Sequence, residues 1–107
     1  MAQTLIRMKA EVLKALGHPT RLALVECLGR QGEQCVCVLA ELVACADRTT
    51  ISKHLAILRA AGIVSDRKEG LKVFYRLSRP CVNRILTCIE QMVLSRVRQE
   101  QAVLNRK

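Results

Sequence analysis

The sequence predicts a mainly helical protein with one small β-hairpin, and three observations lead to that class. Apolar residues recur at helical spacing through most of the 107 residues. Between residues 63 and 77 the pattern changes to β-branched and aromatic residues around a charged turn. Half of the residues are hydrophobic, but only Phe74 and Tyr75 are aromatic, so the core must be aliphatic. A chain of this length supports one core, which predicts a single domain over residues 1–107.

Four helices are expected before the hairpin. The first covers about residues 5–16 and ends at a glycine and a proline, and the second covers about residues 20–32 and closes at two glycines. A short third helix lies within residues 34–43, which begin QCVCVL. Residues 47–50 form a polar turn with good N-cap side chains. The fourth helix therefore covers about Thr49–Ala61.

The hairpin is expected from residues 63–64 and 72–77, with the tip RKEGLK at residues 67–72, where Gly70 can adopt a positive φ. Ser78 and Pro80 then open a last helix with a broad apolar face. That face is too broad for a monomer of this size to cover, and the first helix has a similar stripe, so we expect a homodimer. Its apolar residues are Val82, Ile85, Leu86, Ile89, Met92, Val93 and Val97.

Positive charge is concentrated in one block. Residues 48–84 carry nine Lys and Arg against two acidic residues, whereas residues 1–47 are balanced. Such a block is expected of a face that binds a polyanion, although it is also compatible with a solvated surface that keeps the protein soluble.

A short helix, a turn and a second helix with a polar outer face describe a helix-turn-helix, and the basic hairpin that follows suits a wing. The inward apolar stripe of the fourth helix turns the hydroxyl and basic side chains at its start outward, where base edges and phosphates of double-stranded DNA could be reached. The predicted DNA-binding residues are Thr49, Thr50, Ser52, Lys53, His54 and Arg59 on the helix and Arg67, Lys68 and Lys72 on the hairpin.

Four stretches resemble the ArsR/SmtB family of winged-helix metal sensors, and within it the arsenical-resistance repressors. They are LKALGHPTRLALV (13–25), QCVCVLAELV (34–43), TTISKHLAILRAAGIVSDRKEG (49–70) and VFYRL (73–77), and they cover most of residues 5–80. The resemblance implies a winged helix-turn-helix repressor that dimerises through its first and last helices, binds operator DNA and is released by an inducer.

Cys35 and Cys37 are the predicted metal ligands. Thiolates select soft ions such as As(III), Cu(I), Cd(II) or Zn(II), and nearby helix N-terminal amides favour the thiolate. On a regular helix residues i and i+2 point about 200° apart, so we expect the first turn to be irregular if both sulfurs bind one ion. The resemblance implies As(III) or Sb(III) as the inducer, with another thiophilic metal as an alternative. The plain alternative is two small residues that fill the start of a helix.

A third thiol of the arsenic-sensor pattern is missing, because Val38 and Ala40 stand at the corresponding places. Cys81, Cys88 and Cys27 are candidate third or alternative ligands. A Cys27–Cys88 redox or persulfide switch stays open, as does a soft-metal-binding module without DNA binding. Packing is also possible for each of them, and for Cys45 before the turn.

An enzyme is not expected. The chain contains no Cys-x-x-Cys, and no Cys, His and Asn set with a supporting context; His18 suits a helix entry better than a ligand role. No apolar run approaches a membrane span and the N-terminus lacks a signal-peptide pattern, so we expect a cytoplasmic protein. In that compartment six cysteines indicate metal or redox chemistry before structural disulfides.

Overall fold

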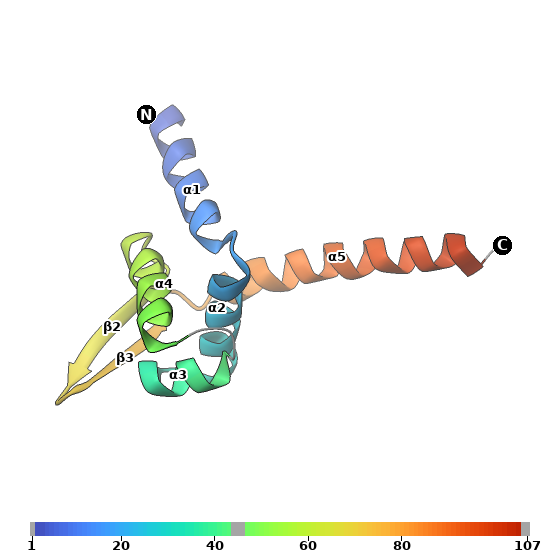
Figure 1. Ribbon diagram of the computed structural model, residues 1–107. Helices are drawn as coiled ribbons and strands as arrows, with labels where there is room; N and C mark the ends of the chain where they lie inside the picture. Colours follow the sequence, from blue (N-terminus) through green and yellow to red (C-terminus); the bar gives the residue numbers. More distant parts are fainter. Residues whose placement is uncertain (1, 44–46, 106–107) are drawn as a thin grey trace.

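The computed structural model describes residues 2–43 and 47–105 of the chain. A small body of packed helices carries a β-hairpin on one side, and the first and last helices project away from it (Figure 1). The elements are α1 (Ala2–Leu16), α2 (Pro19–Gln31), β1 (Gln34–Cys35), α3 (Val36–Leu42), α4 (Arg48–Ala60), β2 (Val64–Glu69), β3 (Lys72–Leu77) and α5 (Val82–Asn105). The expected mainly helical winged helix-turn-helix fold is confirmed.

The core lies where α2, α3 and α4 meet the base of the hairpin. The predicted inward stripe of α4 is fully buried: Ile51, Leu55 and Leu58 each have 0% exposure. Leu24 of α2 and Leu39 of α3 are equally buried against them. Burying an aliphatic side chain of this size contributes about 1.5–3 kcal/mol, so these contacts hold the outer face of α4 in a fixed orientation.

Two polar residues cap the helices as the sequence predicted. His18 is the N-cap of α2, and its Nδ1 accepts a hydrogen bond from the backbone N–H of Thr20 at 3.1 Å. Asp47 is the N-cap of α4, and its Oδ1 accepts from the backbone N–H of Thr50 at 2.9 Å. A cap of this kind is worth about 1 kcal/mol.

The sheet has three strands in the order β1-β3-β2, all antiparallel, whereas the sequence predicted a two-stranded hairpin only. The additional strand β1 places Gln34 opposite Tyr75 and Cys35 opposite Phe74. A strand of two residues is too short to show an alternating pattern, and it forms because β3 offers an edge that β2 does not cover. The tip has Gly70 at φ 62, with Glu69 opposite Lys72.

The two projecting helices carry apolar side chains on their surfaces. Exposed large apolar residues include Leu5, Ile6, Met8 and Leu13 on α1, and Ile85, Ile89, Met92, Val93 and Val97 on α5. Only Leu86 of α5 is buried in the described protomer. Among the described residues, no helix is both long enough and apolar enough to cross a membrane.

Candidate nucleic-acid interface and thiol site

The start of α4 presents a polar surface. Thr49, Thr50, Ser52 and Lys53 are all exposed, on the side opposite the buried stripe. The Asp47 cap fixes the first turn of the helix. These hydroxyl groups and the ammonium group are therefore placed where a partner could reach them without any unfolding of the core.

His54 does not project outward, contrary to the sequence expectation. Its ring is half-buried and lies 4.5 Å from the His18 ring, centroid to centroid. Its Nδ1 is 3.2 Å from a guanidinium nitrogen of Arg21. Burial, and then the nearby His18 and Arg21, lower the pKa of His54 below its usual 6.5. Position 54 borders the apolar stripe of α4, so the histidine links α4 to α2.

The basic residues of this face fall into two groups. Arg59 is paired with Asp66 at 2.8 Å. Arg67 is paired with Glu33 at 2.7 Å and Glu69 at 2.6 Å, and its guanidinium lies 4.6 Å from the Phe74 ring centroid. The second group forms no salt bridge within residues 2–43 and 47–105: Arg48, Lys53, Lys68 and Lys72.

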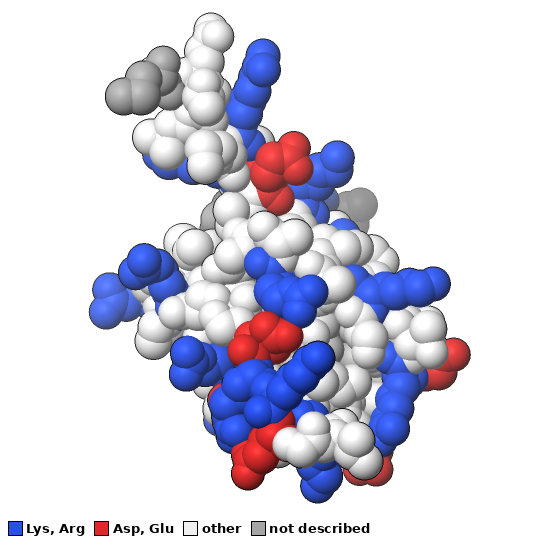
Figure 2. Space-filling view, turned by 90° about the vertical axis from the view of Figure 1, so that its left-hand side faces the viewer, with Lys and Arg blue, Asp and Glu red and all other residues white. Residues whose placement is uncertain are grey.

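Figure 2 views the molecule from the side of α4 and the hairpin. Lys and Arg side chains gather over the lower half of this face, with carboxylates between them. Since Glu33 and Glu69 already neutralise Arg67, the charge available to a polyanion is smaller than the sequence count of nine basic residues indicates.

Cys35 lies at the junction of β1 and α3. It is the N-cap of α3 with extended backbone angles, φ −71° and ψ 149°, so it is not part of the helix. For both sulfurs to bind one ion, the backbone at Cys35 must depart from regular helix geometry. It already does so in this structure, and no turn of α3 has to unwind. Cys35 is buried and Cys37 is half-buried.

The surroundings of Cys35 favour its thiolate. Its pKa is lowered chiefly by the Cys37 side chain, and further by the backbone N–H groups of Cys37 and Val38 and by the charge of Lys72. These amides act at short range although the Cys35 side chain forms no regular capping hydrogen bond. A lowered pKa makes this sulfur a better metal ligand and nucleophile at neutral pH.

A hollow of about 390 Å³ joins the thiol pair to the predicted DNA-binding surface. The same hollow is lined by Ser52 and Arg48 at the start of α4 and by Lys72 at the start of β3. The full lining is Cys35, Val36, Cys37, Arg48, Ser52, Leu71, Lys72 and Val73. A ligand held by the two sulfurs would therefore stand directly beside the residues predicted to touch DNA.

The other cysteines are not brought to this pair. Cys27 is buried in α2, and burial raises the pKa of its thiol. Cys81 precedes α5 and Cys88 lies on it, both exposed. Within the part of the chain that the structure describes, no group of three His, Cys, Asp or Glu side chains is placed to hold a metal ion. Cys45 lies outside the described residues.

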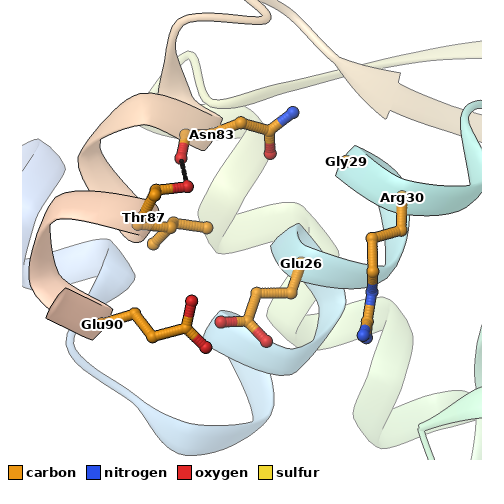
Figure 3. Close-up of a pocket in the computed structure, with 7 residues that line it drawn as sticks. Glu26, Gly29, Arg30, Asn83, Thr87 and Glu90 are labelled. Carbon is orange, nitrogen blue, oxygen red and sulfur yellow. Dashed lines mark hydrogen bonds between the residues drawn. The ribbon is translucent and has the colours of Figure 1, made fainter. Parts of the chain in front are cut away.

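A second hollow, of about 250 Å³, lies between α2 and α5 and contains no thiol. Figure 3 shows the Glu26 and Glu90 carboxylates pointing toward each other across it. On the α5 side the Thr87 hydroxyl donates to the Asn83 carbonyl at 2.9 Å. With two carboxylates against the one guanidinium group of Arg30, this lining does not suit a phosphate backbone, so the hollow is not part of the candidate DNA interface.

Comparison with known proteins identifies the family. Residues 18–66 match the family described as bacterial regulatory protein, arsR family. The chain is 40% identical over 83 residues to an HTH-type transcriptional regulator of Methanocaldococcus jannaschii, covering 78% of this chain and 92% of that protein. The chain belongs to the ArsR family of transcriptional regulators.

Two further relatives are informative about this ArsR-family chain. It is 44% identical over 68 residues to the arsenical resistance operon repressor of Escherichia coli, a match that covers 64% of this chain and 57% of that longer protein. It also superimposes on a homodimeric winged helix-turn-helix DNA-binding domain of Mycobacterium bovis with a TM-score of 0.80 and 28% identity, covering 92% and 89% of the two chains.

Three residues of the site were not singled out from the sequence. Arg48 looked like part of the turn before the fourth helix, and Glu33 gave no sign of its pairing with Arg67, because both placements depend on tertiary contacts. Leu71 was visible as an apolar residue inside the charged tip RKEGLK, and that contrast with its neighbours was a usable signal.

Proposed function

We propose that this protein is a homodimeric repressor that binds double-stranded operator DNA and releases it when Cys35 and Cys37 bind As(III) or Sb(III). One observation carries the proposal: the two sulfurs share a hollow with Ser52 and Lys72, so the ligand site borders the DNA-reading surface. The E. coli relative, a repressor of an arsenical resistance operon, supports the choice of inducer.

In the DNA complex, α4 enters the major groove with its N-terminal turn toward the bases. The Thr49, Thr50 and Ser52 hydroxyls can donate to phosphates and can donate to or accept from base edges, and the Lys53 ammonium can donate to phosphates or to base acceptors. Lys68 and Lys72 bring the wing to the backbone beside that groove. Arg59 and Arg67 stand nearby but share their charge with carboxylates.

The dimer forms through the exposed apolar faces of α1 and α5. A monomer rarely leaves so many large apolar side chains in water. A twofold axis also places two copies of α4 to meet two half-sites of a pseudo-palindromic operator. The homodimeric state of the M. bovis domain supports this arrangement.

Two sulfurs on one short segment suit a soft ion. Cys35 contributes a thiolate that its neighbours stabilise, and Cys37 stands against it. A third sulfur would come from Cys27, Cys81 or Cys88 after rearrangement or between protomers, or from a small cellular thiol, and these sources can replace one another. With the neutral hydroxide As(OH)3 as the inducer, each As–S bond forms as one As–OH bond breaks, and the thiol proton leaves with that hydroxyl group as water.

Ligand binding can reach the DNA surface along two short connections. Cys37 lies in the first turn of α3, which packs against α4. Cys35 pairs with Phe74 of β3, on which Arg67 of the wing lies. A displacement at the thiol pair is thus transmitted to α4 and to the wing, and a coupling of about 1–3 kcal/mol is enough to release an operator several-fold or more.

The test is operator binding by fluorescence anisotropy, with As(III) titrated into the preformed complex on the protein's own promoter region. Cys35→Ser and Cys37→Ser should bind DNA as the wild type does and remain bound when As(III) is added. Cys81→Ser and Cys88→Ser serve as matched controls and should still be released. If the controls lose the response and the Cys35 and Cys37 variants keep it, the sensing site lies on the last helix.

A thiol-redox repressor is the second candidate, because the contact between Cys35 and Cys37 that lowers the Cys35 pKa also favours oxidation of that sulfur. Diamide in place of As(III) separates the two functions in the same assay. Release by diamide, without release by As(III) or Sb(III), would assign the pair to redox sensing.

A further inference from the structure

The tip of the hairpin carries a large apolar side chain that none of the described residues covers. Leu71 has 105% relative exposure, the highest among the exposed large apolar residues. It follows Gly70 in the two-residue connection between Glu69 and Lys72. Gly70 has a φ of 62° and no other residue of the connection has a positive φ, which is the pattern of a type II′ turn. The turn therefore holds Leu71 at the outermost point of a rigid ribbon.

The surroundings of Leu71 indicate its partner. Lys68 and Lys72 lie on either side of the tip, and neither makes a salt bridge to any described residue. Leu71 and Lys72 also line the hollow that reaches Ser52 on α4. An apolar side chain flanked by two available cations, and continuous with the recognition helix, fits a polyanion with a groove that this side chain can enter, rather than a lipid or a second apolar surface.

The position of the tip selects the groove. With α4 in the major groove, a ribbon that projects to the side of α4, as the hairpin does in Figure 1, crosses the phosphate backbone. Beyond that backbone lies the minor groove. Apolar side chains are used there by several classes of DNA-binding protein as contacts or wedges between base steps.

We infer that Leu71 enters the minor groove beside each half-site and makes the protein prefer A·T over G·C pairs at that place. The inference rests on the proposed operator binding. Its physical basis is the guanine N2 amino group, a donor in the minor groove that A·T pairs lack. Leucine excludes water and offers no acceptor, so it leaves this donor without a partner, and a buried donor without a partner is costly.

The probe is a labelled duplex that the wild-type chain selects from random-sequence DNA, with the wing contacts located by hydroxyl-radical footprinting. The base pairs under the tip are then set to A·T, G·C or inosine·C. Inosine lacks the N2 amino group but keeps the major-groove edge of guanine. The wild type should bind the A·T and inosine·C duplexes alike, and the G·C duplex more weakly by about fivefold in Kd per half-site.

Two variants complete the test, and neither should disturb folding, because the Leu71 side chain is fully exposed among the residues that the structure describes. Leu71→Ala should bind all three duplexes with one common affinity, and Leu71→Met should keep the discrimination. Equal penalties for G·C and inosine·C, or an unchanged preference in Leu71→Ala, would overturn the inference while leaving the repressor proposal intact. If no duplex is selected at all, the proposed function fails and the inference fails with it.

Discussion

At the scale of single residues, the basic side chains around the wing differ in how much charge they can offer. Arg67 stands between two carboxylates and over an aromatic ring, whereas Lys72 stands in the hollow beside two thiols. Counterions leave the DNA when a protein cation neutralises a phosphate, and a cation already paired with a carboxylate in the protein neutralises a phosphate less. The contribution of a basic residue to DNA binding is therefore predicted better by whether it is already ion-paired in the protein than by its position on the wing.

This difference is measurable as a salt dependence. Lys68→Gln and Lys72→Gln should each reduce the slope of log Kd against log salt by about 0.9 per lost phosphate contact, hence up to about 1.8 in a dimer. Arg67→Gln should reduce it by less than half as much, because Glu33 and Glu69 already hold the charge. Anisotropy titrations at several salt concentrations give the slopes. Equal slopes for all three variants would show that the Arg67 ion pairs with Glu33 and Glu69 break when DNA binds.

His54 gives a pH dependence to stability. Its pKa in the folded protein is lower than the usual 6.5, so the folded state binds its proton less readily than the unfolded chain does. The stability contribution is complete above that usual value and is lost as the pH falls through it toward the folded pKa. His54→Gln should therefore lose less stability than the wild type between about pH 7.5 and pH 5.5.

Urea unfolding followed by circular dichroism at the two pH values measures this. Identical losses in the wild type and His54→Gln would mean that protonation of His54 is not what destabilises the junction of α2 with α4.

At the scale of elements, the packing of α5 against α2 depends on the absence of a side chain at Gly29. A Cβ at Gly29 would stand 2.1 Å from the Asn83 Oδ1 and 2.9 Å from its Cγ. Gly29→Ala should therefore destabilise the protomer by about 1–3 kcal/mol. Adding Asn83→Ala should restore most of the loss, because it removes the atoms in the way.

Gly17→Ala is the matched control, since its Cβ would meet only backbone oxygens at ordinary distances of 3.4 and 3.5 Å. Urea denaturation gives the free energies of unfolding. If Gly29→Ala were as stable as Gly17→Ala, the Asn83 side chain would be able to change its rotamer without a measurable loss of stability.

The elements also show how far the sequence could lead. Helical spacing predicted all five helices to within a few residues, because each one carries aliphatic side chains at helical spacing. On α4 this stripe is buried in the protomer, as Ile51, Leu55 and Leu58 show, whereas on α1 and α5 most of it is exposed. The strand β1 could not be predicted, because it depends on the edge of β3, which lies about 40 residues further along the chain. For the same reason the extended backbone of Cys35 was not visible, and a residue placed by sequence in a helical turn is in fact its cap.

The candidate site was predictable in its chemistry and less so in its geometry. The residue types of QCVCVL indicate soft-ion binding without any structure. That Ser52 and Lys72 line the same hollow follows only from the packing of α3, α4 and β3 around it. The inward position of His54 likewise depends on His18 and Arg21 of another helix.

At the scale of the whole molecule, the two projecting helices determine whether two protomers join, and therefore whether two copies of α4 can bind one DNA duplex. Met92 lies on the exposed apolar stripe of α5 at 67% exposure, and little in the described protomer covers it. A charge placed there would be buried without a partner in the dimer but solvated in the monomer. Met92→Glu should therefore shift sedimentation from dimer toward monomer without lowering the helix content. Gln91→Glu, one position away and about 100° around the helix, outside the apolar stripe, adds the same charge and should leave the dimer unchanged.

Operator binding should weaken together with dimerisation. One protomer reaches a single half-site, and the second half-site gains from the first only while the two copies remain joined. Met92→Glu should therefore lose affinity for a two-half-site duplex far more than for a duplex with one half-site, and raising the protein concentration should restore part of the loss. Anisotropy with the two duplexes measures this difference. If Met92→Glu remains dimeric, or if both duplexes lose affinity equally, then the apolar face of α5 is not the surface that joins the two protomers for DNA binding.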